Sequence, residues 1–197
     1  MTTYVKVENL NKESFDKLIQ LIYPPKGEYS IQSVEIVNRL FGTDYSVEEK
    51  QFPDNVWMLD NIGAKWIEIE CDDSPEFDTT YSFRVISAWH VPEEYLLTLT
   101  QTLVDIKSDV VLYGTYEDES YDPIGAFVYA DEYEDSEDLD IEIDFDQLWG
   151  DDDYRISIFD ELHLLKENLY DSYLEYLADK LIDEVPSPLV PYNCAAV

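Results

Sequence analysis

The sequence predicts an α+β domain, with a mostly antiparallel sheet and helices packed on one of its faces. Residues 67–70 and 139–146 alternate apolar and acidic side chains, which is typical of antiparallel strands with one covered and one solvated face. Residues 11–22, 30–41 and 90–106 instead place apolar residues three or four positions apart, as amphipathic helices do. Along the chain the predicted order of elements is ααββαβββα, which favours an α+β fold.

The N-terminal part is predicted to be two helices followed by a loop. The first helix is expected over 11–22, and two prolines and a glycine soon after it end the pattern. The second is expected over 30–41, with Ser30 as its N-cap and Gly42 as its stop signal. Residues 43–62 lack a clear period and are expected to be mostly loop.

Strands dominate the middle of the chain. They are predicted at 65–71, 81–89, 109–116, 124–130 and 139–146. The helix at 90–106 has Pro92 in its first turn. A second long helix is expected at about 158–184, with Leu181 near the end of its apolar face.

These elements suggest one globular unit with three parts. Residues 1–50 are expected to be a helical segment packed on the core, 51–185 an α+β domain, and 186–197, which hold the last three prolines, an irregular tail. A chain of 197 residues with 14% aromatic content can bury a sizeable core, so we expect a folded protein rather than a disordered acidic one.

Negative charge is the outstanding feature of the composition. The chain has 45 acids and 12 bases, a net charge of −33, and residues 99–197 hold 27 of the acids but only 4 of the bases. Such a field disfavours binding to nucleic acid or to an anionic membrane, and it favours basic protein surfaces or cations. We therefore expect a basic protein as the partner, with no direct binding to nucleic acid or to membranes, and the sequence leaves a homodimer open.

The location is expected to be the cytoplasm. The first fifteen residues lack the apolar core of a signal peptide, and no apolar run approaches the length of a membrane span. Cys71 and Cys194 lie far apart, which favours free thiols in a reducing compartment, although a single disulfide stays open.

Two predicted elements carry carboxylates in regular rows. On the long helix, acids recur every fourth residue, at Glu167, Asp171, Glu175, Asp179 and Asp183. Like charges at this spacing destabilise a helix by roughly 0.2–0.5 kcal/mol per pair. A function that uses the row would explain why the helix carries it. On the predicted strand, Asp140, Glu142, Asp144 and Asp146 share a face, about 6.6–6.8 Å apart.

Rows of carboxylates at this spacing can imitate the phosphates of a DNA backbone, and sites that accept phosphates through Lys and Arg would accept them. Glu68 and Glu70 repeat the strand pattern and could lie on a nearby strand. The acids at 117–119, in the turn after the strand at 109–116, add to the charge. Trp149, inside the acidic stretch, is either a core residue or an exposed anchor for a partner.

Other chemistry finds less support in the sequence. Halophilic adaptation would spread the acidic residues more evenly along the chain. The simplest alternative to a functional acidic surface is a solvated acidic face that binds nothing. No EF-hand loop fits the acids around Asp144, although loose calcium binding by residues 151–153 stays open. The two histidines and two cysteines lack the spacing of metal ligands, and no catalytic motif is present. We expect no enzymatic activity, no cofactor and no metal.

Three stretches in the middle of the chain have a common family pattern, and they are NIGAKWIEIE (61–70), FRVISAWHVPEEYLLTL (83–99) and YGTYEDESYDPIGAF (113–127). Together they resemble the YubB ferredoxin-like family of phage and plasmid proteins, and the resemblance covers roughly residues 60–130. The residues that carry it are Lys65, Trp66, Trp89, Pro92, Tyr116, Glu117, Gly125 and Phe127. The resemblance implies a ferredoxin-like core within 51–185 and an origin on a mobile element, and it implies no reaction. The acidic strand and helix that follow depart from the family pattern.

These features lead to one functional hypothesis and two alternatives. The chain is expected to be a phage or mobile-element inhibitor that mimics DNA and occupies the nucleic-acid-binding site of a host restriction or nuclease protein. The residues expected to contact it are Glu117, Asp118, Glu119, Asp140, Glu142, Asp144, Asp146, Glu167, Asp171, Glu175, Asp179 and Asp183. The first alternative is an immunity-type or chaperone-type protein that masks a basic partner without imitating DNA, and the second is a calcium-binding module.

Overall fold

The computed structural model describes residues 1–46, 48–49, 51–71, 75–117, 124–138, 147, 150–153, 178–183 and 185. The elements are β1 (Thr2–Glu8), α1 (Lys12–Ile22), β2 (Ser30–Gln32), α2 (Ser33–Phe41), α3 (Asn55–Ile62), β3 (Ile67–Glu70), β4 (Tyr81–Ser87), α4 (Glu93–Val104), β5 (Val111–Glu117), β6 (Ile124–Ala130) and β7 (Tyr133–Asp138). Residues 178–183 are also helical. The predicted α+β class is confirmed.

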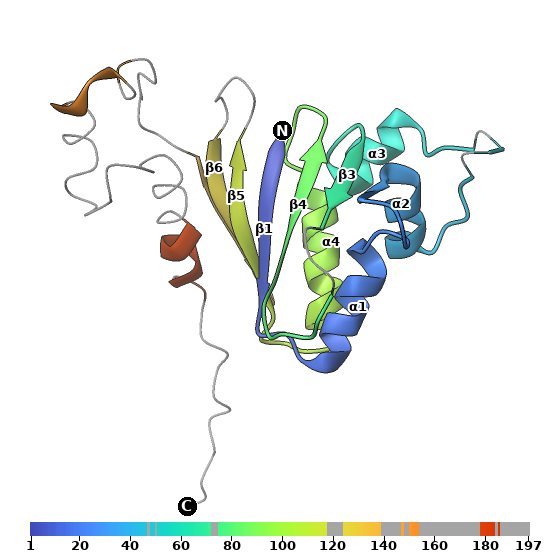
Figure 1. The fold of residues 1–197 in the computed structure, drawn as a ribbon, viewed down its shortest axis with the longest axis horizontal. Coiled ribbons are helices and arrows are strands. Elements are labelled where there is room, and N and C mark those ends of the chain that lie inside the picture. The colour runs from blue at the N-terminus through green and yellow to red at the C-terminus, as the bar shows by residue number, and fades with distance from the viewer. Residues whose placement is uncertain are drawn as a thin grey trace, which may run out of the picture.

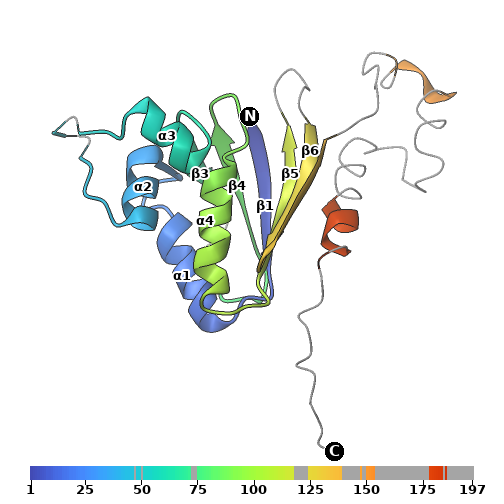
Figure 2. The ribbon, with the colours of Figure 1, turned by 180° about the vertical axis from the view of Figure 1, so that it is seen from behind.

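The seven strands form one sheet in the order β2-β3-β4-β1-β5-β6-β7, and every neighbouring pair is antiparallel. Helices α1 to α4 lie together on one face of this sheet, as Figures 1 and 2 show from opposite sides. The chain passes from β1 through α1 and from β4 through α4, so β3-β4-β1-β5 is a sheet with two helical crossovers.

The main core lies between the sheet and these helices. Alternate strand residues point into it, including Val5 and Val7 of β1 and the predicted pair Ile67 and Ile69 of β3, all almost completely buried. The apolar stripes predicted for the first helix and for the helix after Pro92 meet them, with Phe15, Leu18, Ile22, Leu96, Leu99 and Leu103 buried. Burial of these stripes holds α1 and α4 on the sheet.

A smaller apolar cluster lies on the other face, at β5 and β6. Val111, Tyr113, Ala126 and Val128 point to this side and pack against Ala178 and Leu181 of the helical segment 178–183. The prediction that helices cover one face is therefore correct for α1 to α4, while the end of the predicted long helix covers part of the opposite face. Leu181 is buried, as its place in the predicted apolar stripe requires.

Several boundaries differ from the prediction. Ser30 lies in the short strand β2 rather than at a helix N-cap, and α2 begins at Ser33, whose hydroxyl donates to the carbonyl of Ile67 at 2.9 Å. The stop at Gly42 is confirmed, because this residue takes φ 68° in a left-handed C-cap. Pro92 precedes the first turn of α4 as its N-cap instead of lying inside it.

Four elements were not predicted: β1, β2, α3 and β7. Helix α3 lies in the stretch expected to be loop and begins at Asp54, whose carboxylate accepts from the amide of Trp57 at 2.8 Å. The strand predicted at 139–146, helix residues before 178 and the tail at 186–197 lie outside the described residues. The strand that the structure describes in the acidic run is β7, just before that prediction.

Candidate functional site at the acidic edge of the sheet

The last strand, β7, reads YEDSED and forms one edge of the sheet. Acids are poor strand formers, so its position depends on continuous pairing with β6, from Ala130 opposite Tyr133 to Gly125 opposite Asp138. A two-residue turn of Asp131 and Glu132 joins the strands. Because paired residues share a face, β7 carries acids on both sides of the sheet.

On the outer face, Asp135 and Glu137 stand opposite Val128 and Ala126 of β6. Glu137 accepts a hydrogen bond from the Lys180 ammonium at 2.5 Å, which joins β7 to the helical segment 178–183. The buried residues of that segment face the sheet, and Asp179 and Asp183 are exposed. Residues 178–183, at the end of the predicted long helix, therefore lie beside strand β7.

We call this surface the acidic edge. It comprises Asp131, Glu132, Glu134, Asp135, Glu137, Asp179 and Asp183. Six of the basic side chains that the structure describes are held in ion pairs, namely Lys6, Lys12, Arg39, Arg84, Lys107 and Lys180. Only Lys180 pairs with a member of the acidic edge, so most of its charge is uncompensated by the bases in the described part of the chain.

Three of the twelve predicted contact residues are described. Asp179 and Asp183 belong to the acidic edge, whereas Glu117 ends β5, partly exposed, with its carboxylate 3.4 Å from the Tyr4 hydroxyl that donates to it. The other nine lie outside the described residues, and they are Asp118, Glu119, Asp140, Glu142, Asp144, Asp146, Glu167, Asp171 and Glu175.

Glu68 and Glu70 do not contribute to the acidic edge. They lie on β3, and β4, β1, β5 and β6 separate that strand from β7. Each also has a partner, because Ser30 donates to Glu68 and Arg84 donates to Glu70. On β3 this charge row is part of the polar surface of the sheet.

The five acids at 131–137 were not predicted as site residues. The only signal for them was their place at the start of a strongly acidic run, because a strand with acids on both faces shows no alternation. The missing alternation has a structural cause, since an edge strand leaves both of its faces open where no helix covers it.

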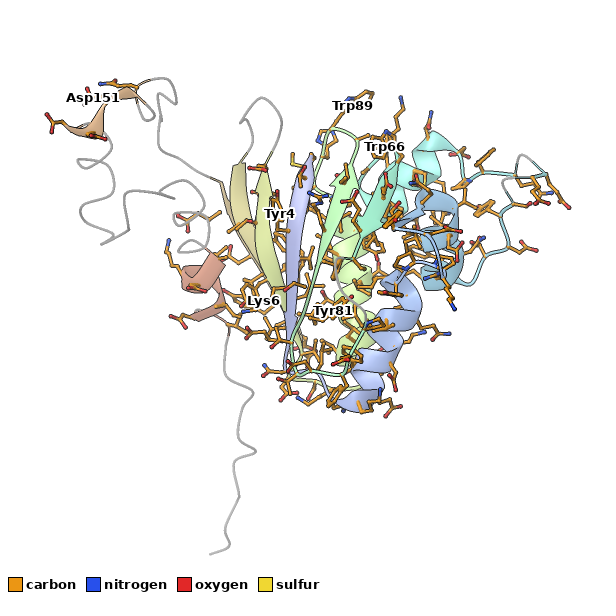
Figure 3. All side chains as sticks on the ribbon, viewed as in Figure 1. Tyr4, Lys6, Trp66, Tyr81, Trp89 and Asp151 are labelled. Carbon is orange, nitrogen blue, oxygen red and sulfur yellow. The ribbon has the colours of Figure 1, made fainter. Side chains whose placement is uncertain are left out.

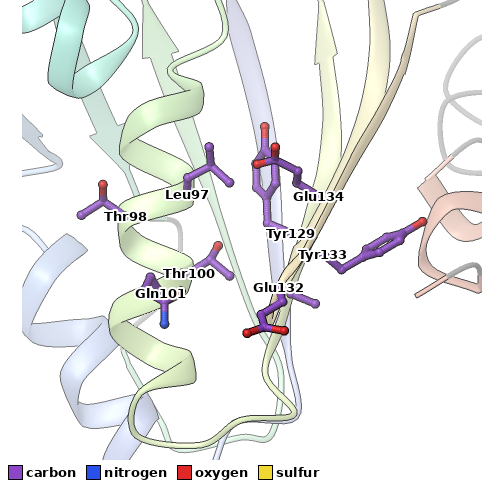
Figure 4. Close-up of a pocket in the computed structure, with 9 residues that line it drawn as sticks. Leu97, Thr98, Thr100, Gln101, Tyr129, Glu132, Tyr133 and Glu134 are labelled. Atoms are coloured by element: carbon purple, nitrogen blue, oxygen red, sulfur yellow. The ribbon is translucent and has the colours of Figure 1, made fainter. Parts of the chain in front are cut away.

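A groove opens between α4 and the β6–β7 hairpin, with a volume of about 500 Å³ (Figure 4). Its walls are Leu97, Thr98, Thr100 and Gln101 from α4 and Tyr129, Ala130, Glu132, Tyr133 and Glu134 from the hairpin. Burial raises the pKa of Tyr129, and the carboxylates of Glu93, Glu134 and Glu94 raise it further, so the phenol stays protonated at neutral pH. The groove is thus acidic, and the Tyr129 hydroxyl in its wall is neutral.

A different surface gathers residues that carry the family resemblance. Trp66 and Trp89 are 46% and 67% exposed and lie at the same end of the sheet (Figure 3). The Lys65 ammonium lies 4.6 Å from the centre of the Trp89 ring, a cation–π contact. Trp89 also has φ 68°, which is rare for a bulky residue. This group lies away from the acidic edge.

The solvent face of the sheet contains one further cluster, on β1 and β5. Glu8 accepts hydrogen bonds from the Tyr113 hydroxyl at 2.8 Å and pairs with the Lys6 ammonium at 2.7 Å. Burial works to raise the pKa of Glu8, but the bonds from Lys6 and Tyr113 outweigh it, so the pKa is lowered. The charges balance locally, and we assign this cluster a structural role.

In the part of the chain that the structure describes, no three His, Cys, Asp or Glu side chains converge as ligands for a metal ion. None of the helices in those same residues has the length and apolar character needed to cross a membrane. Neither models of known protein families, nor curated proteins, nor solved structures match the chain. Function is therefore argued from the acidic edge and its chemistry.

Proposed function

We propose that this protein is an inhibitor that mimics DNA and occupies the nucleic-acid-binding site of a basic host protein, such as a restriction enzyme or another defence nuclease. The observation that carries the proposal is the acidic edge, where carboxylates from β7, its turn and the helical segment 178–183 gather beside one ion-paired lysine. Ordered secondary structure holds these charges in place, which an acidic tail would not do.

The spacing of these carboxylates suits a partner that normally binds phosphates. Side chains two residues apart on one face of a strand, such as Asp135 and Glu137, are about 6.6–6.8 Å apart along it. Asp179 and Asp183, four residues apart on a helical segment, are about 6 Å apart along its axis. Lys and Arg side chains that line a DNA site accept carboxylates through the same charge-assisted hydrogen bonds.

Edge protection is the plainest alternative explanation. Sheets prevent pairing between edge strands by placing charges there, and one or two suffice for that purpose. Here acids also occupy the turn and a separate helical segment that packs on the sheet, where they protect no strand edge. The additional acids favour a binding function over edge protection.

The finer parts of the proposal rest on different observations. The strand order β3-β4-β1-β5, with α1 and α4 as crossovers, supports a ferredoxin-like core. The origin on a phage or plasmid, and the host cytoplasm as the place of action, rest on the family resemblance and on the composition. The residues expected to contact the target, beyond the acidic edge, are those of the strand and helix rows named from the sequence.

The test removes charge from the outer side of the acidic edge. The variant Asp135→Asn, Asp179→Asn, Asp183→Asn loses three charges there, and the control Asp44→Asn, Glu48→Gln, Glu49→Gln loses three exposed charges from the loop before α3. Each protein is immobilised to capture partners from bacterial lysate. Captured partners are purified, and their binding to a short DNA duplex is measured against each variant over a salt series.

A mimic should displace the duplex in proportion to its concentration, with an affinity that falls as salt rises. The edge variant should compete at least about tenfold less well, and the control should match the wild type. Partner, duplex and inhibitor in one complex would instead identify a protein that masks a basic surface. Equal losses in both variants would show that bulk charge, and not the acidic edge, drives binding.

A further inference from the structure

The groove between α4 and the β6–β7 hairpin is lined by a tyrosine whose side chain is almost fully buried. Tyr129 is only 5% exposed, and its ring lies 5.2 Å from that of Phe127. Among the described residues, its hydroxyl makes no hydrogen bond, although it belongs to the groove wall. The burial of the ring fixes this side chain in the groove wall, and its hydroxyl is available to a ligand that enters the groove.

The residue opposite Tyr129 on β7 is Glu134. The two are direct partners in the antiparallel pairing of β6 and β7, which places their β-carbons about 4.5–5.5 Å apart on the same face. Figure 4 shows the Glu134 carboxylate beside the Tyr129 ring. Glu134 also makes no hydrogen bond within the described residues, so an acceptor carboxylate and an unpaired phenol stand side by side.

The other walls restrict what this pair can receive. Glu132 adds a second carboxylate, and none of the nine lining residues is basic. Thr100 is not available as a donor, because its hydroxyl already donates to the carbonyl of Leu96 at 2.8 Å. Leu97 and the ring of Tyr129 supply apolar surface. The site thus offers acceptors at one place and apolar walls around them, and it suits a cation with several N–H donors and an aliphatic stem.

We propose that this groove receives the side chain of an arginine from the basic partner, with its guanidinium donating to Glu134 and to the Tyr129 oxygen. The inference rests on the proposed function, since the DNA-binding site of the target supplies the arginine. A guanidinium fits better than an ammonium, because it is planar, weakly hydrated and able to donate to two neighbouring acceptors at once. Its methylene stem would pack along Leu97 and the Tyr129 ring.

The test uses a small probe, N-acetyl-arginine methylamide, which binds without any partner protein. Its affinity is measured by NMR titration of the amides of α4 and the β6–β7 hairpin in the wild type and three variants. Tyr129→Phe removes the unpaired hydroxyl and keeps the ring. Glu134→Gln removes the carboxylate, and Glu48→Gln makes the same chemical change at an exposed residue of the loop before α3, outside the groove and the acidic edge.

Glu134→Gln should weaken the probe about tenfold, because a charge-assisted bond is lost, and Tyr129→Phe should weaken it severalfold. Glu48→Gln should bind the probe like the wild type, and the matching lysine probe should bind more weakly. Equal affinities in Glu134→Gln and Glu48→Gln would overturn the proposal, since the probe would then respond only to general charge. Resistance of Tyr129→Phe to heat, measured alongside, confirms that weaker binding is not unfolding.

The result is separable from the test of the proposed function. If the probe binds as expected but the protein never displaces DNA from its captured partners, the groove proposal is supported and DNA mimicry is contradicted. If the protein displaces DNA while probe binding does not depend on Tyr129 and Glu134, DNA mimicry is supported and the groove proposal is contradicted.

Discussion

Glu132 occupies the second position of the turn between β6 and β7, with φ 53°. Glycine is the usual residue in this left-handed region, and other residues pay roughly 1 kcal/mol or more to adopt it. Asn9, also at positive φ, is of a type that tolerates it, and its side chain donates to the Asp109 carbonyl at 3.0 Å. Glu132 has no such compensation in the described residues, and it lines the groove.

The exchange Glu132→Gly should therefore stabilise the protein. We expect the free energy of unfolding to rise by up to about 1 kcal/mol, measured by urea denaturation, since the strain disappears. Asp131→Gly, at the neighbouring turn position without a positive φ, serves as the control and should lower stability. A destabilised Glu132→Gly would mean that its side chain contributes to folding rather than to the chemistry of the groove.

Individual core residues were largely predictable, because burial follows periodicity. Ile67 and Ile69, and Phe83 and Val85, alternate along their strands and are buried as expected. The prediction of Ser30 as a helix N-cap was wrong. Serine is a common N-cap residue, but here residues 30–32 pair with β3 as a strand before the helix begins. Tyr129 and Glu134 could not be paired from sequence, because their meeting depends on the hairpin register.

At the scale of elements, the helical segment 178–183 depends on its contact with β5 and β6. Helical stability in proteins comes mostly from tertiary packing, and here burial of Ala178 and Leu181 holds these residues against the sheet. The ion pair between Lys180 and Glu137 is about 40% exposed on both sides, where such pairs contribute about 0–1 kcal/mol. Apolar contact, rather than charge, should therefore fix the acids Asp179 and Asp183.

Leu181→Ala should release the segment without unfolding the sheet. We expect the opening free energy of residues 178–183 to fall by about 2 kcal/mol, since a buried leucine loses its packing, while amides of β1 and β5 keep their protection. Hydrogen exchange with mass spectrometry measures both. Lys180→Gln is the comparison and should cost less than about 1 kcal/mol. The opposite ranking of the two variants would assign the attachment to the ion pair.

Elements were predictable where they were long and one-sided. Helices α1 and α4 and strands β3 to β6 have clear periods, and the structure contains them. Strand β1 was not predicted because Val5 and Val7 are the only apolar residues on its buried face, and most of its other residues are polar. Helix α3 shows no stripe because just Met58 and Ile62 are buried, with Val56 and Leu59 exposed. Strand β7 lacks apolar residues apart from Tyr133, and only its pairing with β6 makes it a strand.

At the scale of the whole molecule, a net charge of −33 opposes folding through self-repulsion. Salt screens exposed charges, and the Debye length falls from about 30 Å at 0.01 M to about 10 Å at 0.1 M. Stability should therefore depend on ionic strength more steeply than in an ordinary protein of this size.

We expect Tm to rise by at least about 3 °C when NaCl increases from about 0.01 M to about 0.1 M, which corresponds to roughly 1 kcal/mol. Differential scanning calorimetry measures the change, and glucose at equal osmolality controls for effects other than screening. A Tm that does not respond to NaCl would mean that the acids are compensated in the folded state, and that would weaken the case for an exposed acidic edge.

The central place of β1 also determines when the protein can fold during its synthesis. Val5 leaves the ribosome early, yet its neighbours in the sheet, Phe83 and Gly114, are made much later. The first strand has neither sheet partner until β4 has emerged, and it lacks its second partner until β5 has emerged. Long-range pairing of this kind is intrinsically slow. A nascent chain that exposes a strand edge for so long is a natural client for chaperones, and early truncation products should aggregate rather than fold.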